Sequence, residues 1–336
     1  MVVPRIPHCQ EFDRLQPYPI VRVAYPDIPK LRMPALWGLL GVRAGQLILK
    51  ERPQVLHLQH VFENGPWGLV FKRLLGIPYW IHTYGEELTL VRRFPWLERL
   101  VRKVLAEAAG ISTISHYTLE LLQHFGVSPE RCLLVHPGVE WQRFQARPPL
   151  RLELPPGRKL LTLGRLMQRK GQDTMIEVLP SLLEEFPDLH YLIAGIGPDE
   201  NRLRALAQAS SASERIHFLG RVDDDQLVPL MQACDVFAHP NRVTPQGDVE
   251  GFGIVFLEAS ACGIPVVGGR SGGTVDAVSD RHSGFLVEGA EELRQRLRWL
   301  LTHPEQARAM GEAGREWSRG FDWKGPAGRI WEASTR

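Results

Sequence analysis

The sequence predicts two doubly wound α/β domains that face each other across a cleft. Short β-branched runs alternate with longer helical patterns almost throughout, which is typical of parallel sheets covered by helices on both faces. A length of 336 residues accommodates two such domains. A proline-rich segment near the middle breaks the alternation. In folds of this class, ligands bind at the carboxyl ends of the strands.

Strands are predicted from short β-branched runs, and helices from apolar residues that recur every three or four positions. Helical periodicity is clear over Asp173–Phe186 and Asn201–Gln208. The predicted strands are 20–24, 54–58, 79–83, 110–115, 132–136, 159–163, 190–194, 215–219, 236–239, 265–268 and 284–287.

The segment Glu140–Pro156 contains four prolines and no clean periodicity, so we place the linker between the domains there. We therefore expect an N-terminal domain over residues 1–148 and a C-terminal domain over residues 149–318. Residues 319–336 are expected to form a C-terminal helix that packs back on the N-terminal domain.

Composition restricts the class of protein only loosely. A net charge of +2 gives no indication of a nucleic-acid partner. The four cysteines lie far apart, without metal-ligand spacing, which is typical of reduced thiols in a cytosolic protein. No stretch approaches the ~20 apolar residues that a membrane-spanning helix needs, and the first thirty residues show no secretory pattern. We expect a cytoplasmic protein, soluble or peripheral on a membrane.

The first motif follows the strand 159–163 and reads Gly164-Arg165-Leu-Met-Gln-Arg-Lys170-Gly171. Gly164 allows the backbone to approach a ligand closely. Arg165 and Lys170 place two cations at the carboxyl end of the strand, a pattern that suits a diphosphate. On its own, the pair is more typical of a solvated basic loop than of a ligand site.

The second motif joins a glycine-bearing turn to a helix. Gly251 and Gly253 precede a helix that is predicted to run to about Cys262. Such a turn favours phosphate binding, because free N–H groups and the helix dipole both face the anion. Glu250 lies before this helix and Glu258 about one and a half turns into it. Ser271-Gly272-Gly273 follows a later strand and forms another bare turn suited to the same ligand.

Together these motifs resemble the retaining glycosyltransferases of family 4, which have the GT-B fold. The resemblance covers about residues 50–330, and residues 248–263 are most similar to the phosphatidylinositol mannoside mannosyltransferases of the family. The resemblance implies two Rossmann-like domains, with the acceptor side over residues 1–148 and a nucleotide-sugar donor site over residues 149–318. The motifs that carry it are Gly164-Arg165-x4-Lys170-Gly171, Phe218-Leu-Gly-Arg221-Val222, Glu250-x7-Glu258 and Ser271-Gly-Gly273.

The resemblance also implies roles for individual residues. Arg165 and Lys170 would hold the donor diphosphate and stabilise its charge as the glycosidic bond breaks. Glu258 would accept the ribose hydroxyls, and backbone near Val222 would pair with the base. Glu250 would hold the sugar hydroxyls, helped by backbone N–H groups from Phe252 to Ile254. The implied donor-binding residues are Gly164, Arg165, Lys170, Val222, Phe252, Gly253, Ile254 and Glu258.

The N-terminal half supplies a second catalytic candidate beside Glu250. His82 ends the predicted strand 79–83, and the family motif implies that it contacts the donor sugar. A lone histidine at a strand end is otherwise more often structural. Ser115 ends the predicted strand 110–115, where it suits either a phosphate ligand or the N-cap of a helix over His116–Phe125.

The family resemblance implies transfer of a hexose, mannose first, to a hydroxyl of a lipid, polyol or glycan. The expected donor is GDP-mannose, with a UDP-sugar second. No cofactor and no metal are expected, because the run Asp223-Asp-Asp225 opens a predicted helix, where acids favour the dipole.

Residues 90–107 carry arginines, a lysine and aromatic residues in an amphipathic pattern. This pattern suits an anionic membrane surface, on the inner face of the plasma membrane, and an ordinary packed helix equally well.

Family members begin with a strand and a glycine-rich turn that this chain lacks, and Met1-Val-Val-Pro4 instead resembles their second strand. An N-terminal domain without its usual first strand leaves unpaired backbone. The alternative function is therefore a truncated glycosyltransferase or a catalytically silent subunit that binds a nucleotide sugar. A serine hydrolase is a remote third hypothesis, because Gly269-Arg-Ser271-Gly-Gly273 fits G-x-S-x-G.

Overall fold

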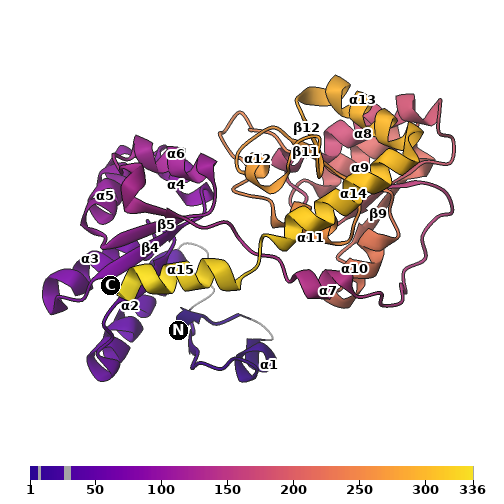
Figure 1. Cartoon of the computed structure of the whole chain (residues 1–336). Helices are drawn as coiled ribbons and strands as arrows, with labels where there is room; N and C mark the ends of the chain where they lie inside the picture. The colour runs from indigo at the N-terminus through magenta and orange to yellow at the C-terminus, as the bar shows by residue number, and fades with distance from the viewer. Residues whose placement is uncertain (7–8, 26–31, 336) are drawn as a thin grey trace.

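The computed structural model describes residues 1–6, 9–25 and 32–335. Two α/β domains lie side by side and are joined by two adjacent crossings of the chain (Figure 1). At the crossings, the Val139 backbone N–H donates to the Phe321 carbonyl at 2.7 Å. The structure thus has the two-domain α/β architecture that the sequence predicts.

The C-terminal domain is built on a six-stranded parallel sheet with the order β12-β11-β10-β7-β8-β9. This is a doubly wound order, whose topological switch point lies between β7 and β10. Every residue of β8, β10, β11 and β12 is buried, as expected of a sheet covered on both faces. The strands are β7 (Lys159–Leu163), β8 (His190–Ala194), β9 (Ile216–Gly220), β10 (Val236–His239), β11 (Val266–Gly269) and β12 (Gly284–Val287).

Helices cover both faces of this sheet and form two hydrophobic clusters with it. One cluster packs around Tyr191 and Leu160, and the other around Phe237 and Phe256. The helices are α8 (Gln172–Leu183), α9 (Glu200–Ala209), α10 (Asp224–Gln232), α11 (Ile254–Ala261), α12 (Thr274–Ala277), α13 (Gly289–Thr302) and α14 (Pro304–Arg319).

The N-terminal domain has a four-stranded parallel sheet, β3 (Leu56–Gln59), β4 (Tyr79–Thr83), β5 (Gly110–Thr113) and β6 (Cys132–Leu134), paired in chain order. A separate two-stranded parallel sheet pairs β1 (Val2–Pro4) with β2 (Val21–Val23). Each of the eleven strands predicted from the sequence is present within a residue or two of its predicted ends, and β1 is additional. The helices are α1 (Cys9–Arg14), α2 (Arg32–Glu51), α3 (Gly65–Leu75), α4 (Glu86–Val91), α5 (Pro95–Glu107) and α6 (His116–His124).

The segment expected to be the linker lies on the C-terminal domain. Its helix α7 (Trp141–Gln145) is anchored there, because the Trp141 indole N–H donates to the Arg315 carbonyl and the Gln145 amide donates to the Ala261 carbonyl. The chain therefore crosses between domains just before residue 141, ahead of the expected boundary at 148. The final helix α15 (Lys324–Thr335) lies against β5 of the N-terminal domain (Figure 1).

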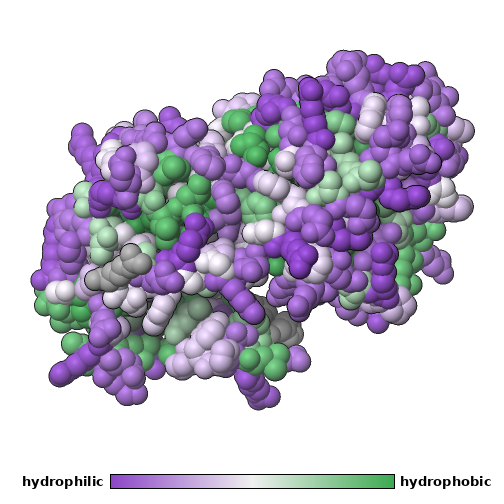
Figure 2. All heavy atoms as spheres, viewed as in Figure 1, coloured by the Kyte–Doolittle hydropathy of each residue, from purple (hydrophilic) through white to green (hydrophobic). Residues whose placement is uncertain are grey.

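Hydrophobic side chains reach the surface in several patches of the N-terminal domain (Figure 2). Trp37, Val42 and Leu49 of α2 are exposed, and so is Leu74 of α3. Among the described residues, no helix is both long enough and apolar enough to cross a membrane.

Candidate active site

The loop after β7 is pinned across the switch point of the C-terminal sheet. Gly164 has a φ of +146°, and a Cβ there would lie 3.7 Å from the ring of His239 at the end of β10. Gly171, with a φ of +75°, would place a Cβ 2.1 Å from the Pro240 carbonyl oxygen. At Gly171, only glycine allows both the left-handed backbone and this close approach. The loop is therefore held against the end of β10, where a doubly wound sheet binds its ligands.

Two ion pairs join this loop to the segment before α11. Lys170 Nζ lies 2.5 Å from Glu250 Oε2, with side chains 11% and 12% exposed. Beside it, Arg169 bonds Asp248 at 3.0 Å. The structure thus places Lys170 and Glu250 in direct contact, although they belong to two separate motifs in the sequence. Arg169 and Asp248 were missed, although each stands next to or near a predicted site residue in the sequence.

Arg165 differs from the other cations of the loop. Its side chain is exposed and makes no hydrogen bond or ion pair with the residues that the structure describes. Its guanidinium therefore remains available to a ligand. An unpaired guanidinium has five N–H donors suited to a phosphate.

The glycine-bearing turn leads directly into α11, as predicted. Gly253 has a φ of +91° and occupies the N-cap position. No side chain caps this end, so no capping side chain accepts a hydrogen bond from the first N–H groups of the helix. The Ser271-Gly272-Gly273 turn packs onto the same place. The Gly273 N–H donates to the Glu250 carbonyl at 2.9 Å, and a Cβ at Gly273 would lie 2.0 Å from the Gly251 oxygen. The two predicted turns therefore form one surface.

Asn241, which the sequence analysis missed, holds these turns in place. Its side chain donates to Thr274 Oγ1 at 2.5 Å, and it accepts the Gly269 N–H at 3.1 Å. Its backbone carbonyl accepts the Ser271 hydroxyl at 3.0 Å. Asn241 lies two residues after the end of β10, and this place at the carboxyl end of a strand could have indicated a site residue. Among the described residues no histidine bonds Ser271, so the structure gives the serine-hydrolase hypothesis no support.

Glu258 lies on α11, partly buried and facing α7. Burial raises the pKa of its carboxyl, and the nearby Arg143 guanidinium opposes this shift. Its side chain makes no hydrogen bond with the described residues. Val222 lies just past β9, partly buried. Phe252 is buried, and its ring stacks against His136 with centroids 5.4 Å apart.

The N-terminal domain contacts the candidate site through the main chain of the segment after β4. A Cβ at Gly251 would lie 2.4 Å from the Tyr84 carbonyl oxygen, because the chain after β4 reaches across the cleft. His82 stands two residues earlier, on the face of the sheet. There His82 Nδ1 lies 2.6 Å from Ser112 Oγ, and its Nε2 lies 3.0 Å from His57 Nδ1. Both of these side-chain partners lie within the N-terminal domain.

His82 is held as a neutral imidazole. Burial, and secondarily the neighbouring His57, lowers its pKa to about 4. Ser115 is the N-cap of α6, since its Oγ accepts the Thr118 N–H at 3.1 Å. In the acidic run that opens α10, Asp224 pairs with Arg143 and Asp225 with Arg151.

Helix α5 turns its apolar side inward. Val101, Val104 and Leu105 are fully buried in the core of the N-terminal domain. Trp96 is 67% exposed, and the basic residues Arg99 and Lys103 also face solvent. The amphipathic pattern of residues 90–107 is thus explained largely by packing, which leaves an exposed aromatic and basic edge.

Comparison with known proteins follows this division into domains. Residues 2–143 match the family described as Glycosyltransferase Family 4, and residues 152–317 match the family described as Glycosyl transferases group 1. The GDP-mannose-dependent alpha-(1-6)-phosphatidylinositol monomannoside mannosyltransferase of Mycolicibacterium smegmatis is 35% identical over 263 residues, covering 74% of this chain and 68% of the relative. The protein of the same name from Mycobacterium tuberculosis is 40% identical over 245 residues, covering 70% and 63%. The chain thus spans about two thirds of the length of these relatives.

Solved structures share the fold at low sequence identity. Anabaena HepE in complex with UDP-glucose has a TM-score of 0.79 at 17% identity, covering 99% of this chain and 91% of that one. Sucrose-phosphate synthase from Thermosynechococcus elongatus has a TM-score of 0.77 at 19% identity, covering 93% and 82%. With the two domains, the switch-point site and these relatives established, the chain belongs to glycosyltransferase family 4 and is a glycosyltransferase with the GT-B fold.

Proposed function

We propose that this glycosyltransferase transfers mannose, with retention, from GDP-mannose to a hydroxyl of a lipid acceptor. The observation that carries the proposal is the enclosed Lys170–Glu250 pair beside the bare entrance of α11 at the switch point. The relatives at 35% and 40% identity, whose names specify GDP-mannose and a phosphatidylinositol monomannoside, support the choice of sugar and acceptor.

The donor diphosphate competes with Glu250 for Lys170. Binding of the anion between Arg165, Lys170 and the N–H groups from Phe252 to Ile254 supplies fixed positive charge where the leaving group gains negative charge. Glu250 is then released to accept hydroxyls of the sugar. Because these groups are positioned before the donor arrives, little reorganisation is needed during bond cleavage.

Two other contacts complete the proposed donor site. Glu258 accepts the ribose hydroxyls, and backbone near Val222 contacts the base. His82 is the proposed acceptor-side contact to the sugar, which requires the segment from His82 to Tyr84 to adjust when the donor binds. The proposed chemistry uses no cofactor and no metal at the donor diphosphate.

A catalytically silent subunit that binds a nucleotide sugar is the second proposal. The observation that favours it is the separation of β1 and β2 from the four-stranded sheet of the N-terminal domain. Donor binding is common to both proposals, and turnover belongs to the first alone.

The test combines a binding panel with a turnover assay. Purified protein is titrated with GDP-mannose, UDP-glucose and ADP-glucose, and release of free nucleotide is followed with and without a phosphatidylinositol mannoside acceptor. Tight GDP-mannose binding with acceptor-dependent GDP release supports the enzyme. Binding without any release, including slow hydrolysis, supports the silent subunit. Preference for UDP-glucose would overturn the choice of donor.

We also propose that the protein associates peripherally with an anionic membrane on the cytoplasmic side, where a lipid acceptor resides. The edge formed by Trp96, Arg99 and Lys103 supports this proposal, because basic and aromatic side chains together favour an anionic interface.

A further inference from the structure

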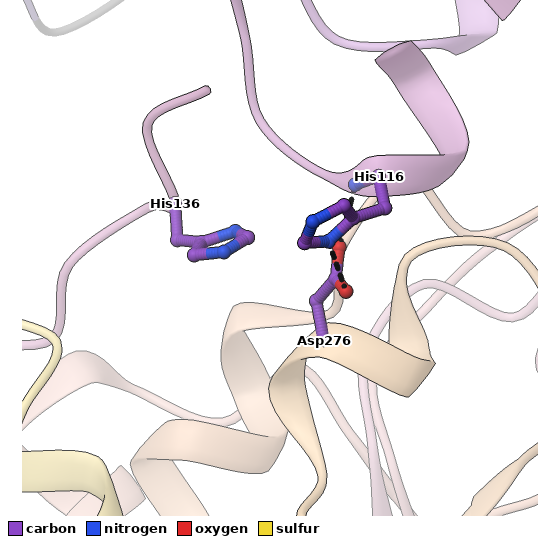
Figure 3. A group of neighbouring side chains, drawn as sticks. All are labelled: His116, His136 and Asp276. Carbon is purple, nitrogen blue, oxygen red and sulfur yellow. Dashed lines mark hydrogen bonds and ion pairs between the residues drawn. The ribbon is translucent and has the colours of Figure 1, made fainter. Parts of the chain in front are cut away.

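Two histidines and one aspartate meet where the two domains face each other (Figure 3). His116 is the first residue of α6, and His136 follows β6, both from the N-terminal half of the chain. Asp276 comes from α12 of the C-terminal domain. One ligand atom from each residue lies within 4.8 Å of the other two. The cluster lies outside the Lys170–Glu250 pair, and the proposed glycosyl transfer makes no use of it.

The Asp276 carboxylate already accepts hydrogen bonds from His116 of the other domain. Its Oδ2 accepts the His116 backbone N–H at 2.7 Å, and its Oδ1 accepts from His116 Nδ1 at 2.9 Å. The carboxylate is only 10% exposed, whereas the His116 ring is 62% exposed. The aspartate is therefore a fixed point, and the His116 ring is free to adjust around it.

The hydrogen bond made by His136 leaves its Nε2 lone pair available to a metal. Its Nδ1 lies 3.0 Å from the Ile114 carbonyl oxygen. A carbonyl only accepts, so Nδ1 carries the proton and Nε2 carries the lone pair. A ring N–H donated to a carbonyl is the usual second contact of a metal-bound histidine. Stacking on Phe252 fixes the ring further, with its centroid 5.9 Å from that of His116.

We propose that His116, His136 and Asp276 bind a divalent transition-metal ion of the Zn²⁺ class, which ties the two domains together. Two imidazoles with one carboxylate favour Zn²⁺, Co²⁺ or Ni²⁺ over Mg²⁺ or Ca²⁺, which prefer all-oxygen sites. Three protein ligands leave a fourth tetrahedral position for water or an anion.

The three ligand atoms lie within 4.8 Å of one another and must adjust to the spacing of a metal site. Ligand atoms about 2.0 Å from a tetrahedral Zn²⁺ lie roughly 3.3 Å apart. The 2.9 Å separation of His116 Nδ1 and Asp276 Oδ1 already suits two ligands of one ion. The ion takes the place of the proton between these atoms, and His116 then carries its proton on Nε2. His136 Nε2 completes the set.

A cation bound by these three residues favours the closed arrangement of the two domains. Asp276 belongs to the short helix that follows the Ser271-Gly272-Gly273 turn, which packs against Glu250 and Gly251. Holding Asp276 to the N-terminal domain therefore also holds that turn near the cleft. An ion that binds only the closed arrangement shifts the population toward it.

The test measures metal binding and shape directly. Chelator-treated protein is titrated with Zn²⁺ by calorimetry and with Co²⁺ by visible absorption, and small-angle scattering is recorded with and without Zn²⁺. We expect one ion per chain, a tetrahedral Co²⁺ spectrum, a smaller radius of gyration with Zn²⁺ and no comparable effect of Mg²⁺. His116→Ala, His136→Ala and Asp276→Asn should each weaken Zn²⁺ binding by about tenfold or more.

His124→Ala is the matched control, since His124 lies on the same helix α6 and outside the cluster. Circular dichroism of each variant verifies that it folds, and Asp276→Asn retains an acceptor for the His116 N–H. Absence of a Zn²⁺ site in the wild type, or a Zn²⁺ affinity in all three variants equal to that of the wild type, overturns the proposed site. Zn²⁺ binding that leaves the radius of gyration unchanged overturns the coupling to closure. Neither result bears on GDP-mannose binding.

Discussion

Lys170 Nζ and Glu250 Oε2 lie 2.5 Å apart at the topological switch point, although eighty positions separate them in the sequence. Both side chains are nearly buried. The Glu250 carboxylate binds the Lys170 ammonium as an anionic ligand would. This pair both stabilises the loop after β7 and keeps a cation in place for the diphosphate.

Removal of one partner should therefore destabilise the protein as well as weaken donor binding. Breaking a buried pair leaves an uncompensated charge, which costs about 3–5 kcal/mol when burial is complete. We expect Lys170→Met to lower the free energy of unfolding and to weaken GDP binding. The double variant Lys170→Met/Glu250→Gln should regain stability in urea unfolding, while calorimetry still shows weak GDP binding. Equal GDP affinity in wild type and Lys170→Met would falsify the role of Lys170.

Gly251 is predicted to control closure of the cleft. A Cβ at this position would lie 2.4 Å from the Tyr84 carbonyl oxygen of the other domain. Gly251→Ala should keep the domains apart, with a loss of turnover of about 100-fold, because misplacement by about 1 Å can cost that much. GDP affinity should change little, since most of the donor site belongs to the C-terminal domain.

Gly328→Ala on α15 is the control for Gly251→Ala, because an added Cβ there meets nothing within 4 Å. Steady-state release of GDP and calorimetric GDP binding are measured for both variants. Normal turnover in Gly251→Ala would show that the close approach of Tyr84 is not needed during catalysis.

His82 should make stability depend on pH. Its pKa is lowered from 6.5 to about 4 in the folded protein. The unfolded chain therefore binds more protons between these values, so the contribution is complete above about pH 6.5 and is lost as pH falls toward 4. The loss is at most about 3 kcal/mol, since one pKa unit corresponds to about 1.4 kcal/mol, and partial exposure reduces it.

The measurement for His82 is urea unfolding at about pH 7 and about pH 4.5. In His82→Gln the difference in unfolding free energy between the two conditions should shrink, because glutamine does not titrate. His57 and His239 also have lowered pKa values, so some pH dependence should persist in the variant. An unchanged difference would mean that His82 is not desolvated in solution.

Local sequence was enough to predict the strands and the turns. Strands buried on both faces form continuous apolar runs, and Gly253 and Gly263 bound α11 by backbone conformations that glycine favours. Local sequence could not show which segments that lie far apart in the chain pack together in the fold. A sequence shows that Lys170 and Glu250 have opposite charges, and it does not show that the loop after β7 lies against the entrance of α11.

His82 illustrates the same limit. Its position near the end of a strand does not show which face of the sheet its side chain occupies, because side chains alternate between the faces. The register of three neighbouring strands places it beside Ser112 and His57. That register depends on pairing between distant segments. The buried state of Arg169 was hidden for the same reason, because its partner Asp248 lies in another loop.

The exposed edge of α5 should bind anionic vesicles through its charge. The apolar side of the helix is packed in the core, so attraction depends on Arg99, Lys103 and the exposed ring of Trp96. Each basic residue near an anionic surface contributes about 1 kcal/mol, so Arg99→Glu/Lys103→Glu should weaken vesicle binding by roughly 30-fold or more. Arg294→Glu/Arg298→Glu, on α13 of the other domain, is the control for charge alone. Co-sedimentation is measured at increasing anionic lipid content and salt, and binding should fall as salt screens the charges. Binding that is indifferent to both variables, or equal in the two variants, would exclude this edge as the membrane contact.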